Sequence, residues 1–132
     1  MTNYLKYYNE VKAQKQIDKL TKKYKNKKIV IYGAGIMSEI LFKNFDLSKL
    51  NIVAICDKKY ETTDEQFRGY KTIKPTDLRE FECDAIFVLL LQELQIIDYL
   101  KDELLINTLN ENIKIEPLIK IPFLKCIKYI FS

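Results

Sequence analysis

The chain has 132 residues, of which 48% are hydrophobic and 30% are charged, and this length and composition are typical of a single globular domain. No apolar run approaches the roughly 18 residues needed to span a bilayer, and the polar, lysine-rich N-terminus is unlike a secretory signal. Histidine is absent, which excludes Ser–His and Cys–His nucleophile pairs and removes the commonest zinc ligand, so no metal site is expected.

The net charge of +4 is unevenly distributed along the chain. Residues 1–28 contain nine lysines against two acidic residues, whereas residues 29–112 contain nine basic and fifteen acidic residues. Proteins that read nucleic acids usually concentrate Lys and Arg on the folded core, and here arginine occurs only at Arg68 and Arg79. We therefore expect no nucleic-acid partner.

The three cysteines are Cys56, Cys83 and Cys126, and no two of them form a C-x-x-C pair. Cys56 and Cys83 lie beside or inside apolar, strand-like runs. Such cysteines are typically buried, reduced thiols, which points to a reducing compartment and predicts a cytoplasmic protein.

Residues 3–25 lack glycine and proline and are rich in good helix formers, which predicts a helix. Its apolar residues fall on two stripes about 150° apart instead of one. The stripes consist of Tyr4, Tyr7, Tyr8 and Val11, and of Ala13, Ile17, Leu20 and Tyr24. Either the helix breaks near residues 11–13, or its first half packs on something other than its own sheet, for which a partner subunit is the natural candidate.

Strand-like and helix-like patterns alternate after residue 27. Strands are predicted at 28–33, 51–57, 70–73, 83–91 and 113–119. Helices are predicted at 36–46 and 93–105, a polar turn at 58–69, and one helical turn after Pro75. This pattern predicts an N-terminal helical extension (1–26), a nucleotide-binding domain (27–119) and a C-terminal amphipathic helix (120–132).

The central strands are apolar on both faces, which is typical of a parallel sheet covered on both sides. The fold class is therefore α/β: a small, Rossmann-like, three-layer domain with a mostly parallel sheet of about five strands, plus N- and C-terminal helices. Right-handed crossovers would place strand 28–33 in the middle of the sheet. Ligands of such sheets bind beyond the carboxyl ends of the strands, where the strand order reverses.

The stretch "IYGAGIMSEI" (31–40) lies at that point and contains the pattern G-x-G-x-x-S. A first glycine permits a tight exit from the strand, a second lets a phosphate approach the backbone, and the helix that follows offers unpaired N–H groups to an anion. Ser38 stands at the third position, which serves helix–strand packing, although its hydroxyl could add a donor. The candidate nucleotide-binding residues are Gly33, Ala34, Gly35, Ile36, Met37 and Ser38.

Three polar residues extend this candidate site. Asp57 ends the second strand, where an acidic side chain can accept hydrogen bonds from an adenosine ribose and disfavours a 2′-phosphate, so NAD is expected over NADP. Lys58 follows it and, like the adjacent Lys59, could meet a phosphate, and Gln92 follows the strand at 83–91 and could also bind the ligand. The alternative is a tight corner with no ligand, in which Asp57 is a solvated strand end.

The run from Lys27 to about Ile119, with "KKIVIYGAG", "NIVAICDKK" and "FRGYKTIKPTDLREFECDAIFVLL", resembles the small Rossmann-type module of bacterial surface-polysaccharide enzymes. This module opens sugar dehydratases and some nucleotide-sugar acyltransferases, and it ends certain sugar methyltransferases. The resemblance implies that the glycine turn and Asp57 contact NAD or a nucleotide sugar. It also implies a role in sugar-nucleotide metabolism.

No catalytic domain of those enzymes follows in this sequence, so we expect binding without complete catalytic activity in this chain alone. Two alternatives remain: a non-catalytic oligomerisation or docking module for a sugar-modifying enzyme, and a small NAD-dependent sugar-nucleotide oxidoreductase. The pairs Tyr8/Lys12 and Tyr24/Lys28 have the spacing of a short-chain dehydrogenase pair, but they precede the first strand, and we attribute the spacing to chance.

The C-terminal segment "PFLKCIKYIFS" places apolar residues on one side of a helix and lysines on another. It could lie on an anionic membrane or dock on the sheet or on another subunit, and docking is favoured. The expected partners are thus a small nucleotide and either a second copy, as a homodimer, or a sugar-modifying enzyme.

Overall fold

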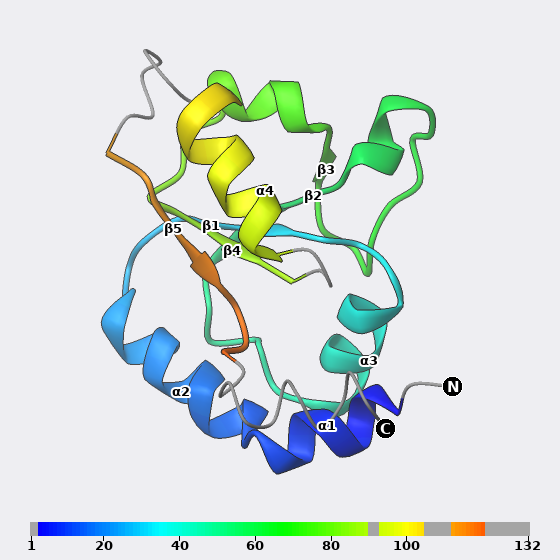
Figure 1. Cartoon of the computed structure of the whole chain (residues 1–132), viewed down its shortest axis with the longest axis vertical. Helices are drawn as coiled ribbons and strands as arrows, with labels where there is room; N and C mark the ends of the chain where they lie inside the picture. The colour runs from blue at the N-terminus through cyan, green and yellow to red at the C-terminus, as the bar shows by residue number, and fades with distance from the viewer. Residues whose placement is uncertain (1–2, 90–92, 105–111, 121–132) are drawn as a thin grey trace.

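The computed structural model describes residues 3–89, 93–104 and 112–120 and contains one five-stranded sheet (Figure 1). The strands are β1 (Ile29–Tyr32), β2 (Ile52–Cys56), β3 (Thr72–Ile73), β4 (Ala85–Val88) and β5 (Lys114–Pro117). Their order is β3-β2-β1-β4-β5, and every neighbouring pair is parallel. The predicted α/β class is confirmed, with a sheet that is wholly parallel. The predictions for Gln92 and for the helix beyond residue 120, as well as Cys126, lie outside the described residues.

Helices cover both faces of the sheet (Figure 1). On one face lie α1 (Tyr4–Glu10), α2 (Ala13–Lys23) and α3 (Ile36–Asn44). On the other lie α4 (Glu93–Tyr99), the 3₁₀ helix η2 (Pro75–Arg79) and the π-helix η3 (Leu100–Leu104). A short 3₁₀ helix, η1 (Lys58–Glu61), follows β2 at its carboxyl end. The predicted helix at 93–105 is therefore α4 continued by η3.

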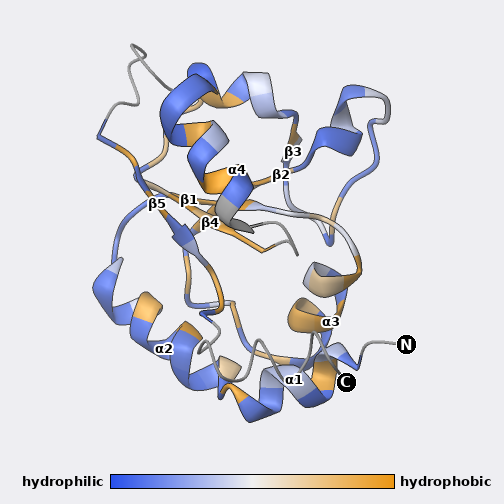
Figure 2. Cartoon of the chain, viewed as in Figure 1, coloured by the Kyte–Doolittle hydropathy of each residue, from blue (hydrophilic) through white to orange (hydrophobic). Residues whose placement is uncertain are grey.

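The central strand β1 is buried along its whole length, as its apolar sequence predicts. Ile29 and Ile31 contribute to the core between the sheet and α1–α3, while Val30 and Tyr32 contribute to the core on the α4 side. In Figure 2 the strands β1 and β4 have mainly hydrophobic colours, while the helices α1 and α2 are largely hydrophilic. Since successive side chains of a strand point to opposite faces, one apolar strand supplies both cores.

The N-terminal helix breaks where the two apolar stripes meet. Lys12 has a φ of 56°, in the left-handed region, and separates α1 from α2. The break turns the second stripe by enough to bury both, so that Tyr8 and Ile17 are each fully buried in the same apolar cluster. Of the two explanations that the sequence left open, the break is the one observed, and α1 packs on α3 of its own chain.

Two glutamines of α2 form hydrogen bonds that join this helix to the rest of the fold. The Gln16 amide donates to the Lys120 carbonyl (3.0 Å) and accepts from the Lys120 N–H (2.7 Å), as a neighbouring strand would. The Gln14 amide makes the same pair of bonds with the backbone of Asp46 (3.1 and 2.8 Å), which lies just beyond α3. The helix is thus hydrogen-bonded to backbone after both β5 and α3.

The two edges of the sheet differ in character. The edge strand β3 is two residues long. The N–H groups of Lys114, in β5, and of Leu118, just after it, donate to the carbonyls of Asp84 and Val88 on the β4 side. Because N–H groups alternate in direction along a strand, the backbone nitrogen of Pro117 faces away from β4. Proline has no N–H, so the outer edge of β5 lacks a donor at that point.

Candidate functional site

The glycine turn lies at the carboxyl end of β1, between β2 and β4, where the strand order reverses. Gly33 has a φ of 135°, which a side chain would rarely tolerate, and its N–H donates to the Cys56 carbonyl (2.8 Å). Gly35 is the N-cap of α3, it is exposed, and a Cβ at this position would have no atom within 4 Å. Gly33 therefore supplies the positive φ angle of the turn and a hydrogen bond to β2. Gly35 leaves the start of α3 open to solvent.

The end of β2 is tied to this turn through both peptide groups of Ala34. The Asp57 carboxylate accepts from the Ala34 N–H (2.8 Å), and the Lys59 ammonium donates to the Ala34 carbonyl (2.8 Å). The second oxygen of Asp57 accepts from the Lys59 N–H (2.9 Å) and caps η1. Each Asp57 oxygen makes one hydrogen bond here and has acceptor capacity left for another donor.

Lys59, and not Lys58, is the lysine that the structure brings to the turn. Lys58 is exposed, and within the described part of the chain it has no hydrogen bond to the turn. The two lysines are adjacent, so the sequence offered no way to choose between them. Only the 3₁₀ geometry of η1, whose N-cap is Asp57, decides which ammonium reaches Ala34.

Ser38 stabilises the turn between β1 and α3 from its buried side. It is fully buried, and its hydroxyl donates to the Gly33 carbonyl (2.6 Å). The small third residue therefore holds the first turn of α3 against the end of β1. The structure directs this hydroxyl to the protein backbone.

The first turn of α3 is also supported by α1, a contribution that the sequence analysis missed. The Tyr8 hydroxyl donates to the Met37 carbonyl (3.0 Å), and the Tyr8 ring packs edge-on against Phe45. The hydroxyl of a buried tyrosine usually has a hydrogen-bond partner, so the apolar stripe that contains Tyr8 was the sequence signal for such a contact. Next to this support, the Ile36 side chain is 61% exposed, which is unusual for a large apolar residue.

A short hairpin packs on the outer side of α3. Phe67 and Tyr70 form an antiparallel bridge around Arg68 and Gly69, which both have positive φ angles (49° and 84°). Both aromatic rings pack on Phe42 of α3. Arg68 also lies 3.7 Å from the Glu39 carboxylate, between partly exposed side chains. The hairpin therefore adds rigidity to the helix that follows the glycine turn.

Two tyrosines near the turn keep their protons at neutral pH. Burial raises the pKa of the Tyr60 hydroxyl to about 12, and the negative charge of Asp57 adds to the effect. Burial likewise raises the pKa of Tyr32 well above its ordinary value. Both hydroxyls are neutral groups beside the site and supply no charge to it.

Neither Tyr–Lys pair of the sequence forms a catalytic arrangement. Tyr8 bonds to Met37, while Lys12 lies exposed at the helix break. The Tyr24 hydroxyl donates to the Glu116 carboxylate, and burial followed by that hydrogen bond raises its pKa. The Lys28 ammonium instead lies 3.0 Å from Glu82. The spacing was therefore a coincidence in a lysine-rich helix.

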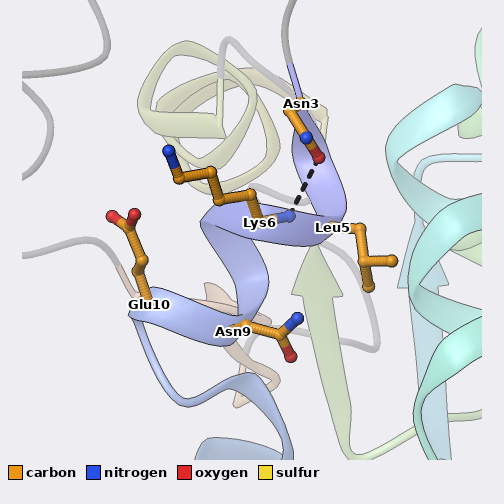
Figure 3. A pocket seen from close by; sticks show the side chains of 5 residues that line it. All are labelled: Asn3, Leu5, Lys6, Asn9 and Glu10. Atoms are coloured by element: carbon orange, nitrogen blue, oxygen red, sulfur yellow. Dashed lines mark hydrogen bonds between the residues drawn. The ribbon is translucent and has the colours of Figure 1, made fainter.

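A shallow pocket lies along α1, and no residue of the glycine turn lines it (Figure 3). Asn3, Leu5, Lys6, Asn9 and Glu10 line it. The Asn3 side chain accepts from the Lys6 N–H (3.0 Å) and caps α1, while Leu5 and Lys6 point in opposite directions from the helix. These side chains do not converge on a common point, so this pocket is a weaker candidate than the turn.

Two absences hold for the described residues, 3–89, 93–104 and 112–120. No group of three or more His, Cys, Asp or Glu side chains is placed to hold a metal ion. In the same part of the chain, no helix has the length and apolar character to cross a membrane.

Comparison with known proteins places the central part of the chain in one family. Residues 25–108, more than half the chain, match the family model described as C2185-like, N-terminal. The matched region contains β1 to β4 and therefore the glycine turn, Asp57 and Lys59. No curated protein matches the chain. No solved structure matches it either.

Proposed function

We propose the following function for this chain, which belongs to the C2185-like, N-terminal family: it binds NAD(H) or a nucleotide sugar at the turn Gly33–Gly35. One observation carries the proposal. An open glycine N-cap stands at the switch point of a parallel sheet of order β3-β2-β1-β4-β5, with an acidic strand end hydrogen-bonded beside it. This is the place where sheets of this strand order hold a diphosphate.

Each part of the ligand has a partner of suitable chemistry. The exposed N–H groups at the start of α3, together with the helix dipole, favour the diphosphate. The Lys59 ammonium, held at Ala34, adds a positive charge next to them. The free lone pairs of Asp57 accept ribose hydroxyls, and the same negative charge disfavours a 2′-phosphate, so NAD is preferred over NADP.

The proposed activity is binding, with any chemistry completed by another protein. The proposed partners are a sugar-modifying enzyme, which would supply that chemistry, or a second copy of this chain, as a homodimer. The assignment to bacterial surface-polysaccharide metabolism is supported by the resemblance of residues 27–119. A cytoplasmic location is supported by the two buried, free thiols Cys56 and Cys83.

The test uses a pair of substitutions that spare the fold. Gly35→Asp and Gly35→Asn both introduce a side chain into open space at a position with a φ of −94°, and both residues are good N-caps. They differ in charge, and only the aspartate repels a diphosphate at the helix start. Binding of NADH and of a UDP-sugar is measured by calorimetry for the wild type and both variants.

The proposal predicts that the wild type binds one of these nucleotides. Gly35→Asp is expected to weaken binding by tenfold or more relative to Gly35→Asn, while both variants keep the wild-type melting temperature or exceed it. Absence of heat or thermal stabilisation with every nucleotide would overturn the proposal. Equal binding by the Asp and Asn variants would exclude the helix start as the diphosphate site.

A further inference from the structure

The helix α2 separates its apolar and basic residues onto two sides. Ala13, Ile17 and Leu20 are buried against the sheet. At 100° per residue, the lysines fall on the opposite side of the helix within an arc of about 100°. This lysine face consists of Lys15, Lys19, Lys22 and Lys23, and all four residues are exposed. In Figure 2 most of the α2 ribbon has the colour of hydrophilic residues.

Little negative charge balances this face within the described part of the chain. Lys23 lies 3.5 Å from the Glu116 carboxylate, and no salt bridge is found there for Lys15, Lys19 or Lys22. The acidic residue of α2, Asp18, accepts a hydrogen bond from Gln14 (3.0 Å). Lysines spaced four apart, such as Lys15 and Lys19, repel each other and destabilise an isolated helix. An anionic surface would relieve this repulsion.

We propose that the lysine face binds the surface of a bilayer that contains anionic phospholipids. The stretch from residue 12 to residue 28 has no arginine, and its aromatic residue, Tyr24, is buried, so the face offers neither forked guanidinium contacts nor rings for base stacking. Lysine ammonium groups on a convex helix instead suit a broad layer of phosphate headgroups, to which each adds a similar increment of affinity.

The binding is electrostatic and reversible, because the apolar side of α2 is already used by the core. The helix lies along the outside of the domain, while the connection from β1 to α3 lies at another side (Figure 1). A chain bound through α2 therefore leaves the glycine turn accessible, and this inference is independent of whether the turn binds a nucleotide.

The test is co-sedimentation of the full chain with vesicles of phosphatidylcholine alone and of phosphatidylcholine mixed with phosphatidylglycerol. The variant is Lys15→Gln/Lys19→Gln/Lys22→Gln, and Lys15→Arg/Lys19→Arg/Lys22→Arg keeps the charge. The matched control, Lys43→Gln/Lys49→Gln/Lys101→Gln, removes three exposed lysines from other elements. Circular dichroism and thermal melting confirm the fold of each variant, and binding to a single-stranded oligonucleotide is measured at the same salt concentration.

The wild type, the arginine variant and the control are expected to bind only the anionic vesicles, and less so as salt rises. The triple glutamine variant is expected to bind roughly a hundred-fold more weakly. The proposal is overturned if the wild type ignores anionic vesicles at low salt, binds both vesicle types equally, or is unaffected by the substitution. Tighter binding to the oligonucleotide than to the vesicles would also overturn it, in favour of a nucleic-acid partner.

Discussion

Asp57 holds the backbone N–H of Ala34 at 2.8 Å, so the residue proposed to bind the ribose also fixes the turn proposed to bind the diphosphate. The Ala34 residue is 2% exposed, so its N–H is largely shielded from water and depends on Asp57 for its hydrogen bond. The relation makes the two halves of the candidate site interdependent. A loss of binding in an Asp57 variant therefore needs a stability measurement beside it.

Asp57→Ala is expected to destabilise the protein by about 1–3 kcal/mol, because it leaves the buried Ala34 N–H unpaired and removes the cap of η1. Urea unfolding measures the change. Glu61→Ala, in the same 3₁₀ helix and exposed, is the control and should shift stability by less than about 0.5 kcal/mol. If the two variants were equally stable, Asp57 would not be a structural residue of the turn.

Ser38→Ala is expected to cost about 1 kcal/mol of stability, because the buried Gly33 carbonyl loses its donor. Nucleotide affinity should stay within twofold of the wild type, since the hydroxyl faces the backbone. Calorimetry and urea unfolding together separate the two roles, with the exposed Ser48→Ala as the reference substitution. A tenfold loss of affinity at unchanged stability would show instead that Ser38 contacts the ligand.

Gln16→Ala is expected to lower stability by about 1 kcal/mol, because it removes the paired hydrogen bonds to the Lys120 backbone and a further bond to the Val11 carbonyl (3.0 Å). Gln16→Glu keeps an acceptor for the Lys120 N–H but loses both donated bonds, so it should also destabilise. Thermal melting compares both with Gln66→Ala, an exposed loop position. A melting temperature unchanged in both Gln16 variants would contradict this role.

Alkaline pH should destabilise the fold through its buried thiols. Burial raises the pKa of Cys83 to about 12 from an ordinary value of 9.0, and burial also raises the pKa of Cys56. Between these pH values the folded chain keeps a proton that the unfolded chain has lost, so stability is full below pH 9 and falls as the pH rises toward 12. Urea midpoints at neutral and alkaline pH, under reducing conditions, measure the fall.

Cys83→Ala should show a smaller decrease over the same pH range, although it starts from a lower stability because a buried atom is lost. The comparison depends on the slope with pH and not on the starting value. An identical slope in the variant and the wild type would mean that the Cys83 thiol does not contribute to the alkaline loss.

The sequence predicted the elements whose hydrophobic period is strong. The apolar runs around Ile31, Ile55 and Phe87 became the three central strands, and the paired glycines placed the turn correctly at the end of β1. The break at Lys12 was predicted only as one of two alternatives. Two apolar stripes on one helix can both be buried if the helix breaks, or if one of them packs on a partner subunit.

The remaining contacts of the site depend on three-dimensional geometry that no local pattern records. The choice of Lys59 over Lys58 follows from the 3₁₀ turn, and the support of Met37 by Tyr8 joins residues 29 positions apart. The backbone pairing of Gln16 with Lys120 spans 104 positions. Long-range polar contacts of this kind use common residue types, so their sequence signal is weak even where their structural effect is large.

The two edge strands of the sheet affect how this protein can associate with copies of itself. An exposed sheet edge can template a further strand from another molecule, which leads to domain swapping or fibrils. Here β3 is too short to hold a ladder, and Pro117 interrupts the donor row of β5. Polymerisation through the sheet is disfavoured in both directions, which leaves the helical surfaces as the places where two molecules can associate.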